Sequence, residues 1–183
     1  MSGPVVRDAT AKDLAAITAI YGEGVLTGTG TFETDPLDAA EMARRIAAVA
    51  ALGLPWLVAE IDGVVVGYAY AGPFRTRAAY RYTVEDSIYV LTSAHGRGVG
   101  KALLTALIAR CEALGVRQIL AVIGDSANTG SVALHAACGF QPAGAVSDVG
   151  WKFDRWLDVV FMQRSLDAGA SAPPSGRGLP LSG

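Results

Sequence analysis

Three β-rich segments follow one another without a helical segment between them, and this order restricts the fold more than any other feature. The first two, 55–61 and 64–71, flank Asp62-Gly63, a dipeptide typical of a hairpin turn. The third covers 80–90. Consecutive parallel strands need a crossover, usually a helix, between them. The sequence therefore predicts an antiparallel meander and disfavours a purely parallel sheet.

Helix-like and strand-like segments flank this meander on both sides. We expect helices over 8–25, 37–52, 100–115 and 128–140, strands over 5–7 and 117–123, Gly-rich or polar loops over 26–36 and 72–80, and a turn with a closing strand over 150–166. The order is β-α-α-β-β-β-α-β-α-β. It predicts an α/β fold in which a mixed, mainly antiparallel sheet is flanked by helices.

The composition indicates one domain followed by a tail. The chain has 183 residues, of which 51% are hydrophobic, and this is enough for one sizeable core. We expect a single domain over residues 1–166. The last stretch, 167–183, consists mainly of Gly, Ala, Ser and Pro and has little to bury, so we expect a disordered tail there.

Charge and cysteine content argue against several kinds of partner. The net charge of -2 gives no support for a nucleic-acid or membrane partner. The N-terminus has no signal pattern and no apolar run reaches about 18 residues, so we expect a soluble cytoplasmic protein. Cys111 and Cys138 make neither a disulfide framework nor a metal cluster. We expect both to be small buried hydrophobic residues, and no metal site.

A glycine-rich turn separates the meander from the next helix. Gly96, Gly98 and Gly100 alternate with other residues there. A Walker A loop would need Gly at His95, and a dinucleotide fingerprint from Gly96 would need Gly at Lys101, so both patterns fail. Backbone N–H groups that converge at a helix N-terminus can still bind a pyrophosphate without a metal. An ordinary glycine-rich turn is the alternative interpretation.

Two motifs resemble those of the GCN5-related N-acetyltransferases (GNAT), which bind acetyl-CoA. The sequence HGRGVG at 95–100 is similar to their pyrophosphate loop, and NTGSVALHAACGF at 128–140 is similar to their second motif. The order and separation of the two motifs also agree. His95 replaces the usual Gln or Arg. We expect the backbone cradle to remain intact and the affinity for the coenzyme to be lower.

A more specific resemblance covers Val5 to Leu166. The segments 29–36, 55–90, 121–140 and 150–159 resemble the phosphinothricin N-acetyltransferase family, which includes methionine sulfoximine and sulfone acetyltransferases. This resemblance implies the GNAT fold, acetyl-CoA as co-substrate and a homodimer. It also implies resistance to herbicide-like amino acids, which is compatible with another physiological task.

The resemblance gives two residues a catalytic role. It places the general base at Glu85, acting through a water, although a solvated carboxylate on a strand is the simpler interpretation. Asp86 is the local rival and is expected to adjust Glu85 electrostatically. His135 matches the position of a general acid that protonates the departing thiolate. A buried core histidine, or a hydrogen bond to the coenzyme or to a Glu85 network, is the alternative.

The resemblance also implies a set of coenzyme-binding residues. They are Ile88, Tyr89 and Val90 at the end of the third meander strand, His95, Gly96, Arg97, Gly98, Val99, Gly100 and Lys101 in and after the glycine turn, and Asn128 and Ser131 in the second motif. A backbone N–H near Val90 is expected to donate to the acetyl carbonyl oxygen. Asn128 also fits the simpler role of a helix N-cap.

The acceptor side is expected to contain Phe32, Arg75, Arg77, Tyr80 and Glu85. Arginine forks suit an amino acid that has a carboxylate and a second oxyanion-like group. The alternatives are a solvated charge run for the arginines and core packing for the two aromatic residues. The Gly/Thr-rich loop is a candidate to complete the pocket of a partner subunit.

Three functions follow from these observations. The first is direct transfer of acetyl from acetyl-CoA to the α-amine of a phosphinothricin- or methionine sulfoximine/sulfone-like amino acid. The second is acetylation of another amine: a polyamine, an aminoglycoside or a protein N-terminus. A cationic acceptor would favour acidic residues where Arg75 and Arg77 stand. The third is a non-catalytic acetyl-CoA-binding module, which the presence of a candidate base and acid disfavours.

Overall fold

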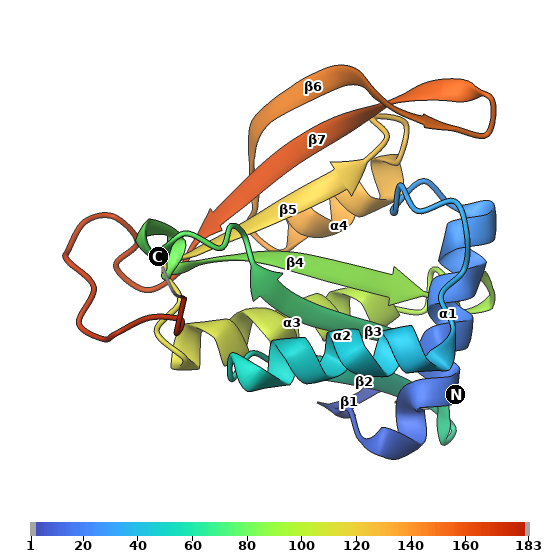
Figure 1. The fold of residues 1–183 in the computed structure, drawn as a ribbon, viewed down its shortest axis with the longest axis horizontal. Coiled ribbons are helices and arrows are strands. Elements are labelled where there is room, and N and C mark those ends of the chain that lie inside the picture. The colour runs from blue at the N-terminus through green and yellow to red at the C-terminus, as the bar shows by residue number, and fades with distance from the viewer. Residues whose placement is uncertain (1–2, 182–183) are drawn as a thin grey trace.

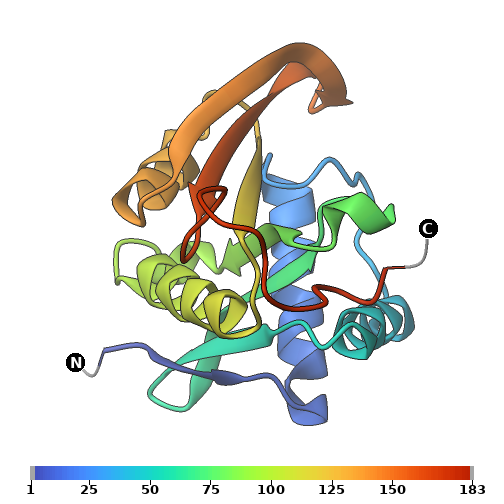
Figure 2. The same ribbon diagram turned by 90° about the vertical axis from the view of Figure 1, so that its left-hand side faces the viewer.

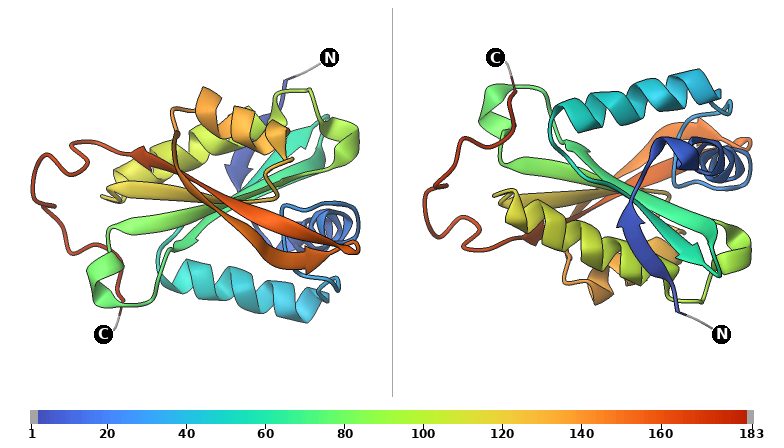
Figure 3. Two further views of the ribbon diagram at one scale, coloured as in Figure 1. Left: turned by 90° about the horizontal axis from the view of Figure 1, so that it is seen from above. Right: turned by 90° about the horizontal axis from the view of Figure 1, so that it is seen from below.

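The computed structural model describes residues 3–181, which contain one seven-stranded sheet in the order β1-β2-β3-β4-β5-β7-β6 (Figure 1). In chain order the elements are β1 (Val5–Asp8), α1 (Leu14–Thr27), α2 (Ala39–Ala51), β2 (Trp56–Ile61), β3 (Val64–Pro73), β4 (Thr83–Val90), α3 (Val99–Ala113), β5 (Gln118–Gly124), α4 (Thr129–Ala137), β6 (Gln141–Lys152) and β7 (Arg155–Ser165), with short 3-10 helices at Ala11–Asp13, Ala78–Tyr80 and Thr92–Ala94. Helices α1 and α2 cover one face of the sheet, and α3 and α4 cover the other (Figure 3).

The predicted meander is confirmed. Strands β2, β3 and β4 pair antiparallel with one another in sequence order. The turn between β2 and β3 has φ of 51° at Asp62 and 79° at Gly63, and a two-residue hairpin turn of type I′ requires positive φ at both positions. The predicted fold class, a mixed and mainly antiparallel sheet flanked by helices, is also confirmed: β4 and β5 pair in parallel, and every other neighbouring pair within residues 3–181 is antiparallel.

The predicted element order was wrong by one strand. The segment that precedes the last turn forms β6, which pairs with β7 at the edge of the sheet. Its side chains are exposed over most of its length, and it contains Pro142, Gly144 and Gly150. An exposed edge strand of this composition has no alternation of apolar and polar residues, which is the signal by which strands are recognised in a sequence.

Strands β4 and β5 separate partway along their length. Their parallel pairing runs from Thr83↔Gln118 to Asp86↔Ala121 and then ends. Beyond that point β4 stays paired with β3 as far as Val90, while β5 stays paired with β7 as far as Gly124. The sheet therefore forks, and backbone groups on the two inner edges of the fork lose their strand partners.

The C-terminal segment, for which the composition predicts a disordered tail, contacts the domain at several points. Over 167–181 it forms no helix or strand, yet its Leu179 is only 8% exposed and donates its N–H to the carbonyl of Arg81. The buried Arg117 side chain donates to the carbonyls of Gly169 and Ala172. Figure 2 shows the segment in dark red, running from the end of β7 past one end of the sheet. The Leu179 side chain and the Arg117 guanidinium therefore hold a segment that has few other apolar residues to bury. Residues 182 and 183 of the expected tail lie outside the described residues.

Candidate active site

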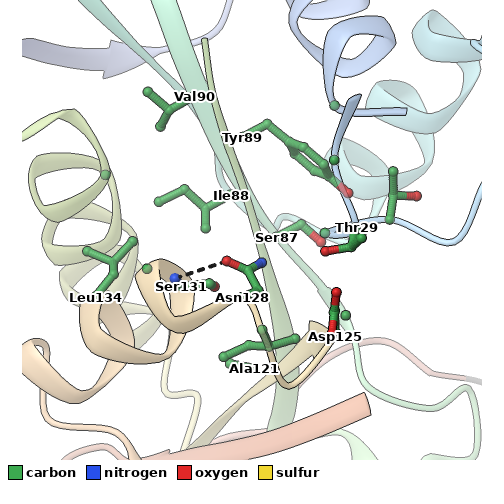
Figure 4. A pocket seen from close by; sticks show the side chains of 18 of the residues that line it. Thr29, Ser87, Ile88, Tyr89, Val90, Ala121, Asp125, Asn128, Ser131 and Leu134 are labelled. Carbon is green, nitrogen blue, oxygen red and sulfur yellow. Dashed lines mark hydrogen bonds between the residues drawn. The ribbon is translucent and has the colours of Figure 1, made fainter. Parts of the chain in front are cut away.

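A cleft of about 1110 Å³ opens at the fork of the sheet. Its walls come from the divergent ends of β4 and β5, the N-terminal ends of α3 and α4, and the loop between α1 and α2. Figure 4 shows side chains from β4, β5, α4 and the loop between α1 and α2 around one space. The cleft is therefore assembled from segments that are far apart in the sequence, and the fork of the sheet is what makes room for it.

The glycine turn lies at one end of the cleft. Gly96 and Gly98 have φ of 72° and 79°, in the left-handed region where a side chain is strained, and Gly98 is the N-cap of α3. No side chain caps this helix, so its first N–H groups are free to bind an anion. A Cβ on Gly100 would lie 3.0 Å from a methyl group of Leu134, so this glycine allows α3 and α4 to pack closely.

The side chains around the glycine turn contribute unequally. His95 and Lys101 line the cleft, whereas Arg97 is exposed and lies outside the lining. Val99 lines the cleft but is only 1% exposed and belongs to the core. The Nε2 of His95 lies 3.1 Å from the carbonyl oxygen of Val90, and a carbonyl only accepts, so Nε2 donates. The His95 side chain is thereby tied to the end of β4.

The free edge of β4 presents backbone donors to the cleft. The Leu91 N–H donates to the Val66 carbonyl, which makes Val90↔Gly67 a non-hydrogen-bonded pair of the β3–β4 ladder. The backbone groups of Ile88 and Val90 consequently point away from β3, toward the side from which β5 has diverged. This orientation is the one required for an N–H near Val90 to bind a carbonyl oxygen.

Glu85 lies on the wall of the cleft next to the fork. Strand alternation places it on the same face as Ser87 and Tyr89, opposite to Ile88 and Val90, whose side chains Figure 4 shows on the other side of β4. Burial raises the pKa of Glu85, the charge of Asp86 raises it further, and the charge of Arg75 lowers it. A carboxylate with a raised pKa is a better proton acceptor near neutral pH than an ordinary one.

His135 pairs with Asp86 and not with Glu85. Its Nε2 lies 3.0 Å from Asp86 Oδ2, and its Nδ1 lies 2.7 Å from the carbonyl oxygen of Ser131. Both side chains line the cleft and are deeply buried, with His135 2% and Asp86 6% exposed. Asp86 and Glu85 project from opposite faces of β4, so the observed partner of His135 is not the Glu85 network that was one of the alternatives, and the sequence did not predict the pair with Asp86.

Asn128 and Ser131 form the cap of α4. The Asn128 Oδ1 accepts the Ser131 N–H at 3.2 Å, as the dashed line in Figure 4 shows. The N-cap role considered from the sequence is thus observed. Both residues also line the cleft, so their position agrees with the expected contact to a coenzyme.

The loop between α1 and α2 closes the other end of the cleft, and a residue that sequence reasoning missed holds it there. Lys152 of β6 is 5% exposed, and its Nζ donates to the carbonyls of Gly28 and Thr31, each at 2.9 Å. Burial lowers the pKa of Lys152. Phe32 lines the cleft, and its ring packs on Gly150 so closely that a Cβ there would lie 2.3 Å from it. A lone lysine among aromatic residues gives no signal of this role in the sequence.

The structure does not bring Arg75, Arg77 or Tyr80 into the wall of the cleft. All three are exposed. Arg75 lies over the ring of Phe74, 4.4 Å from its centroid, and Tyr80 makes an edge contact with the same ring. Of the three, Arg75 alone among the described contacts acts on the site, through its charge on Glu85. The cationic side chains that do line the cleft are Arg45, Lys101 and Arg155.

Comparison with known proteins agrees with this geometry. Residues 17–140 match the acetyltransferase (GNAT) family. A phosphinothricin N-acetyltransferase of Alcaligenes faecalis is 56% identical over 93% of this chain and 85% of its own length, and an L-methionine sulfoximine/L-methionine sulfone acetyltransferase of Pseudomonas paraeruginosa is 43% identical over 92% and 98%. The structure of a phosphinothricin acetyltransferase from Sinorhizobium meliloti in complex with AcCoA superposes with a TM-score of 0.94 at 48% identity, covering 98% of this chain and 97% of that one.

Proposed function

The chain belongs to the acetyltransferase (GNAT) family, and we propose that it transfers acetyl from acetyl-CoA to the α-amine of a phosphinothricin- or methionine sulfoximine/sulfone-like amino acid. The observation that carries this proposal is the cleft, which connects an uncapped, glycine-rich helix N-terminus to Glu85 across the fork of the sheet. An anion site, a free strand edge and a carboxylate with a raised pKa are then parts of one cavity.

The residues present fit acetyl-CoA. The left-handed glycines and the free N–H groups of α3 suit a pyrophosphate, with Lys101 beside them. The free edge of β4 at Ile88 and Val90 suits the amide groups of a pantetheine chain by strand addition. Asn128 and Ser131 lie on the opposite wall. When bound, acetyl-CoA supplies an acetyl group activated as a thioester.

Glu85 is proposed to accept the proton of the acceptor amine through a water, because an ammonium group has no lone pair to attack a carbonyl. The N–H of Val90 would donate to the carbonyl oxygen as it gains negative charge. His135 is proposed to protonate the departing sulfur from Nε2, the nitrogen that is now hydrogen bonded to Asp86. Arg75 is retained as a partner for an anionic group of the acceptor because its charge reaches Glu85.

Direct transfer, without an acetyl-enzyme, is supported by the state of the two cysteines. Cys111 is fully buried, and burial together with the charge of Asp86 raises its pKa to about 12. Cys138 is 7% exposed. A thiol that stays protonated, as Cys111 does, is a poor nucleophile, and neither cysteine lines the cleft.

A panel of acceptors tests the proposed function. The wild-type chain is incubated with acetyl-CoA and one acceptor at a time, and released thiol is measured. We expect release with phosphinothricin, methionine sulfoximine or methionine sulfone. Thiol release only with polyamines, aminoglycosides or peptides would show that the acceptor belongs to that other class of amine. Binding of acetyl-CoA without thiol release in the presence of any acceptor would indicate a non-catalytic binding module.

We also propose that the chain is a homodimer formed through the outer face of the β6–β7 hairpin. The hairpin and its turn carry the exposed apolar side chains Val146, Val149, Trp151, Phe153 and Trp156. Trp151 and Trp156 are paired across the two strands, 56% and 58% exposed, with ring centroids 5.3 Å apart. Contiguous exposed aromatic residues of this kind mark association surfaces, and the family resemblance predicts a second copy as the occupant.

Substitution of Trp151 by Asp is expected to convert the dimer to a monomer at micromolar concentration, because it places a charge in the centre of an apolar contact. Sedimentation velocity measures the change. The control is Val64→Asp, since Val64 is 61% exposed on the distant β2–β3 turn. A monomeric wild type, or a variant that remains dimeric, would exclude this face as the interface.

A further inference from the structure

We propose that Asp86 is a positioning residue: it holds the His135 imidazole at the fork of the sheet and fixes a proton between His135 Nε2 and its own Oδ2. The inference rests on the proposed function for its role in acetyl transfer. Its geometric basis is independent of that function, because it follows from the partners of the two side chains. Asp86 is also the last residue of β4 that pairs with β5, so it stands where the cleft begins.

The hydrogen bonds determine how many protons the pair holds. The Ser131 carbonyl can only accept, so the 2.7 Å contact requires a hydrogen on Nδ1. The 3.0 Å contact between Nε2 and Asp86 Oδ2 requires one more hydrogen, on either atom. With both in place the pair is neutral overall, and with the shared proton on Nε2, as the proposed acid requires, it is an imidazolium beside a carboxylate. The ring is thus held at both nitrogens, and one proton is shared with Asp86.

Burial makes His135 and Asp86 dependent on each other. Asp86 Oδ1 is buried and has no hydrogen-bond partner within the described structure, so the contact from Oδ2 to His135 is the side chain's one recorded hydrogen bond. Leaving a buried polar atom unpaired costs about 1–3 kcal/mol. A carboxyl group kept at this cost in the wall of a cleft, next to the candidate base, indicates a use beyond packing.

Among the groups around His135, Asp86 is the charged partner that favours the protonated imidazole. Burial opposes the charged imidazole, but the hydrogen bond and charge of Asp86, together with the hydrogen bond to the Ser131 carbonyl, outweigh burial, and the pKa of His135 is raised above its ordinary value. Cys111 on α3 stays neutral in the relevant pH range because its pKa is raised to about 12. Glu85 projects from the other face of β4.

This arrangement gives Asp86 a defined part in the proposed reaction. When the carbon–sulfur bond breaks, the sulfur takes the proton from Nε2, and the pair is left with one negative charge. The ammonium nitrogen loses two protons on its way to the amide: the first passes through Glu85 to solvent before the attack, and Glu85 keeps the second, so the charge of the site is conserved from the neutral amine onward. Asp86 therefore acts through His135: its carboxylate keeps the transferable proton on Nε2, the ring nitrogen that faces it.

The chain contains two histidines, so ¹⁵N NMR of their imidazole rings tests the proposal in the full-length protein without coenzyme. A His95→Gln spectrum assigns the signals. We expect the wild-type His135 to keep protons on both nitrogens well above pH 6.5, the value of a free histidine. In Asp86→Asn the Nε2 signal should change to that of an unprotonated nitrogen at lower pH than in wild type, with Nδ1 still protonated.

Glu85→Gln is the matched control, because it removes a carboxylate from the adjacent residue on the opposite face of β4. It should shift the His135 transition far less than Asp86→Asn. In the acetyl-transfer assay, Asp86→Asn should lower kcat by about 10- to 100-fold with the KM for acetyl-CoA changed by less than about threefold.

Two results would overturn the proposal. One is a wild-type His135 that titrates like a free histidine, which needs no variant and so does not depend on whether Asp86→Asn folds. The other is an Asp86→Asn variant with unchanged His135 signals. Absence of acetyl transfer in the wild type would instead contradict the proposed function and leave the NMR result standing.

Discussion

Replacement of Glu85 by Gln is expected to lower kcat by about 10²- to 10⁴-fold, the usual contribution of a general base. The amide has the shape of the carboxylate but cannot accept the proton of the amine. The dissociation constant for acetyl-CoA should change by less than about threefold, because the glycine turn and the β4 edge that bind it are untouched. Steady-state kinetics and calorimetric titration with acetyl-CoA measure the two quantities.

The pH dependence of kcat/KM in the wild type is a second test of Glu85 as the base, because this role predicts the direction of the change. The raised pKa of Glu85 means that the base is lost at a higher pH than for an ordinary glutamate, so kcat/KM should fall as the pH drops through that raised value. This acid limb should be missing from Glu85→Gln. The control is Glu23→Gln, since Glu23 also lines the cleft and its carboxylate accepts the Thr92 N–H. Equal losses in both variants would contradict the role of Glu85.

Substitution of Gly124 by Ala is expected to raise the KM for the acceptor by about 10-fold or more, while the affinity for acetyl-CoA is preserved. A Cβ at this position would lie 2.1 Å from the Thr29 carbonyl oxygen and 2.9 Å from the Phe32 ring. A backbone oxygen cannot move aside alone, so the whole loop between α1 and α2 must shift. Overpacking of this kind costs about 1–3 kcal/mol.

A glycine in the loop itself, Gly30, supplies the control for this prediction. A Cβ on Gly30 would meet nothing within 4 Å, so Gly30→Ala should leave the KM for the acceptor near the wild-type value. Acceptor kinetics at saturating acetyl-CoA compare the two variants. If Gly124→Ala keeps the wild-type KM, the loop does not form part of the acceptor site.

The parts of the fold that were predicted correctly are those marked by a short sequence pattern at the element itself. The Asp62-Gly63 turn determined the hairpin, and the glycines after β4 marked the start of α3. Strand β6 had no such signal, because an exposed edge strand with Pro and Gly lacks alternation. Leu179 likewise packs in a segment whose average composition predicts no packing.

Part of the lining of the cleft was predictable from the sequence, but its contacts were not. Glu85 follows from the family resemblance and the glycine turn from a motif, and both line one cleft. The Asp86–His135 pair joins residues 49 positions apart, and the Lys152–Gly28 bond joins residues 124 positions apart. Such pairs depend on how α4 and β6 pack, which no local pattern specifies. The exposed positions of Arg75 and Arg77 also depend on a loop whose course the sequence does not determine.

Mass spectrometry of a single reaction tests the central claim most directly. Wild-type protein, acetyl-CoA and phosphinothricin are incubated together, and the acceptor, the released thiol and the intact chain are all measured. The proposed function predicts one acetyl group on the α-nitrogen of the acceptor for each thiol released, and an unmodified chain. Thiol release without acetylated acceptor, or an acetylated chain that passes its acetyl group to the acceptor, would contradict it.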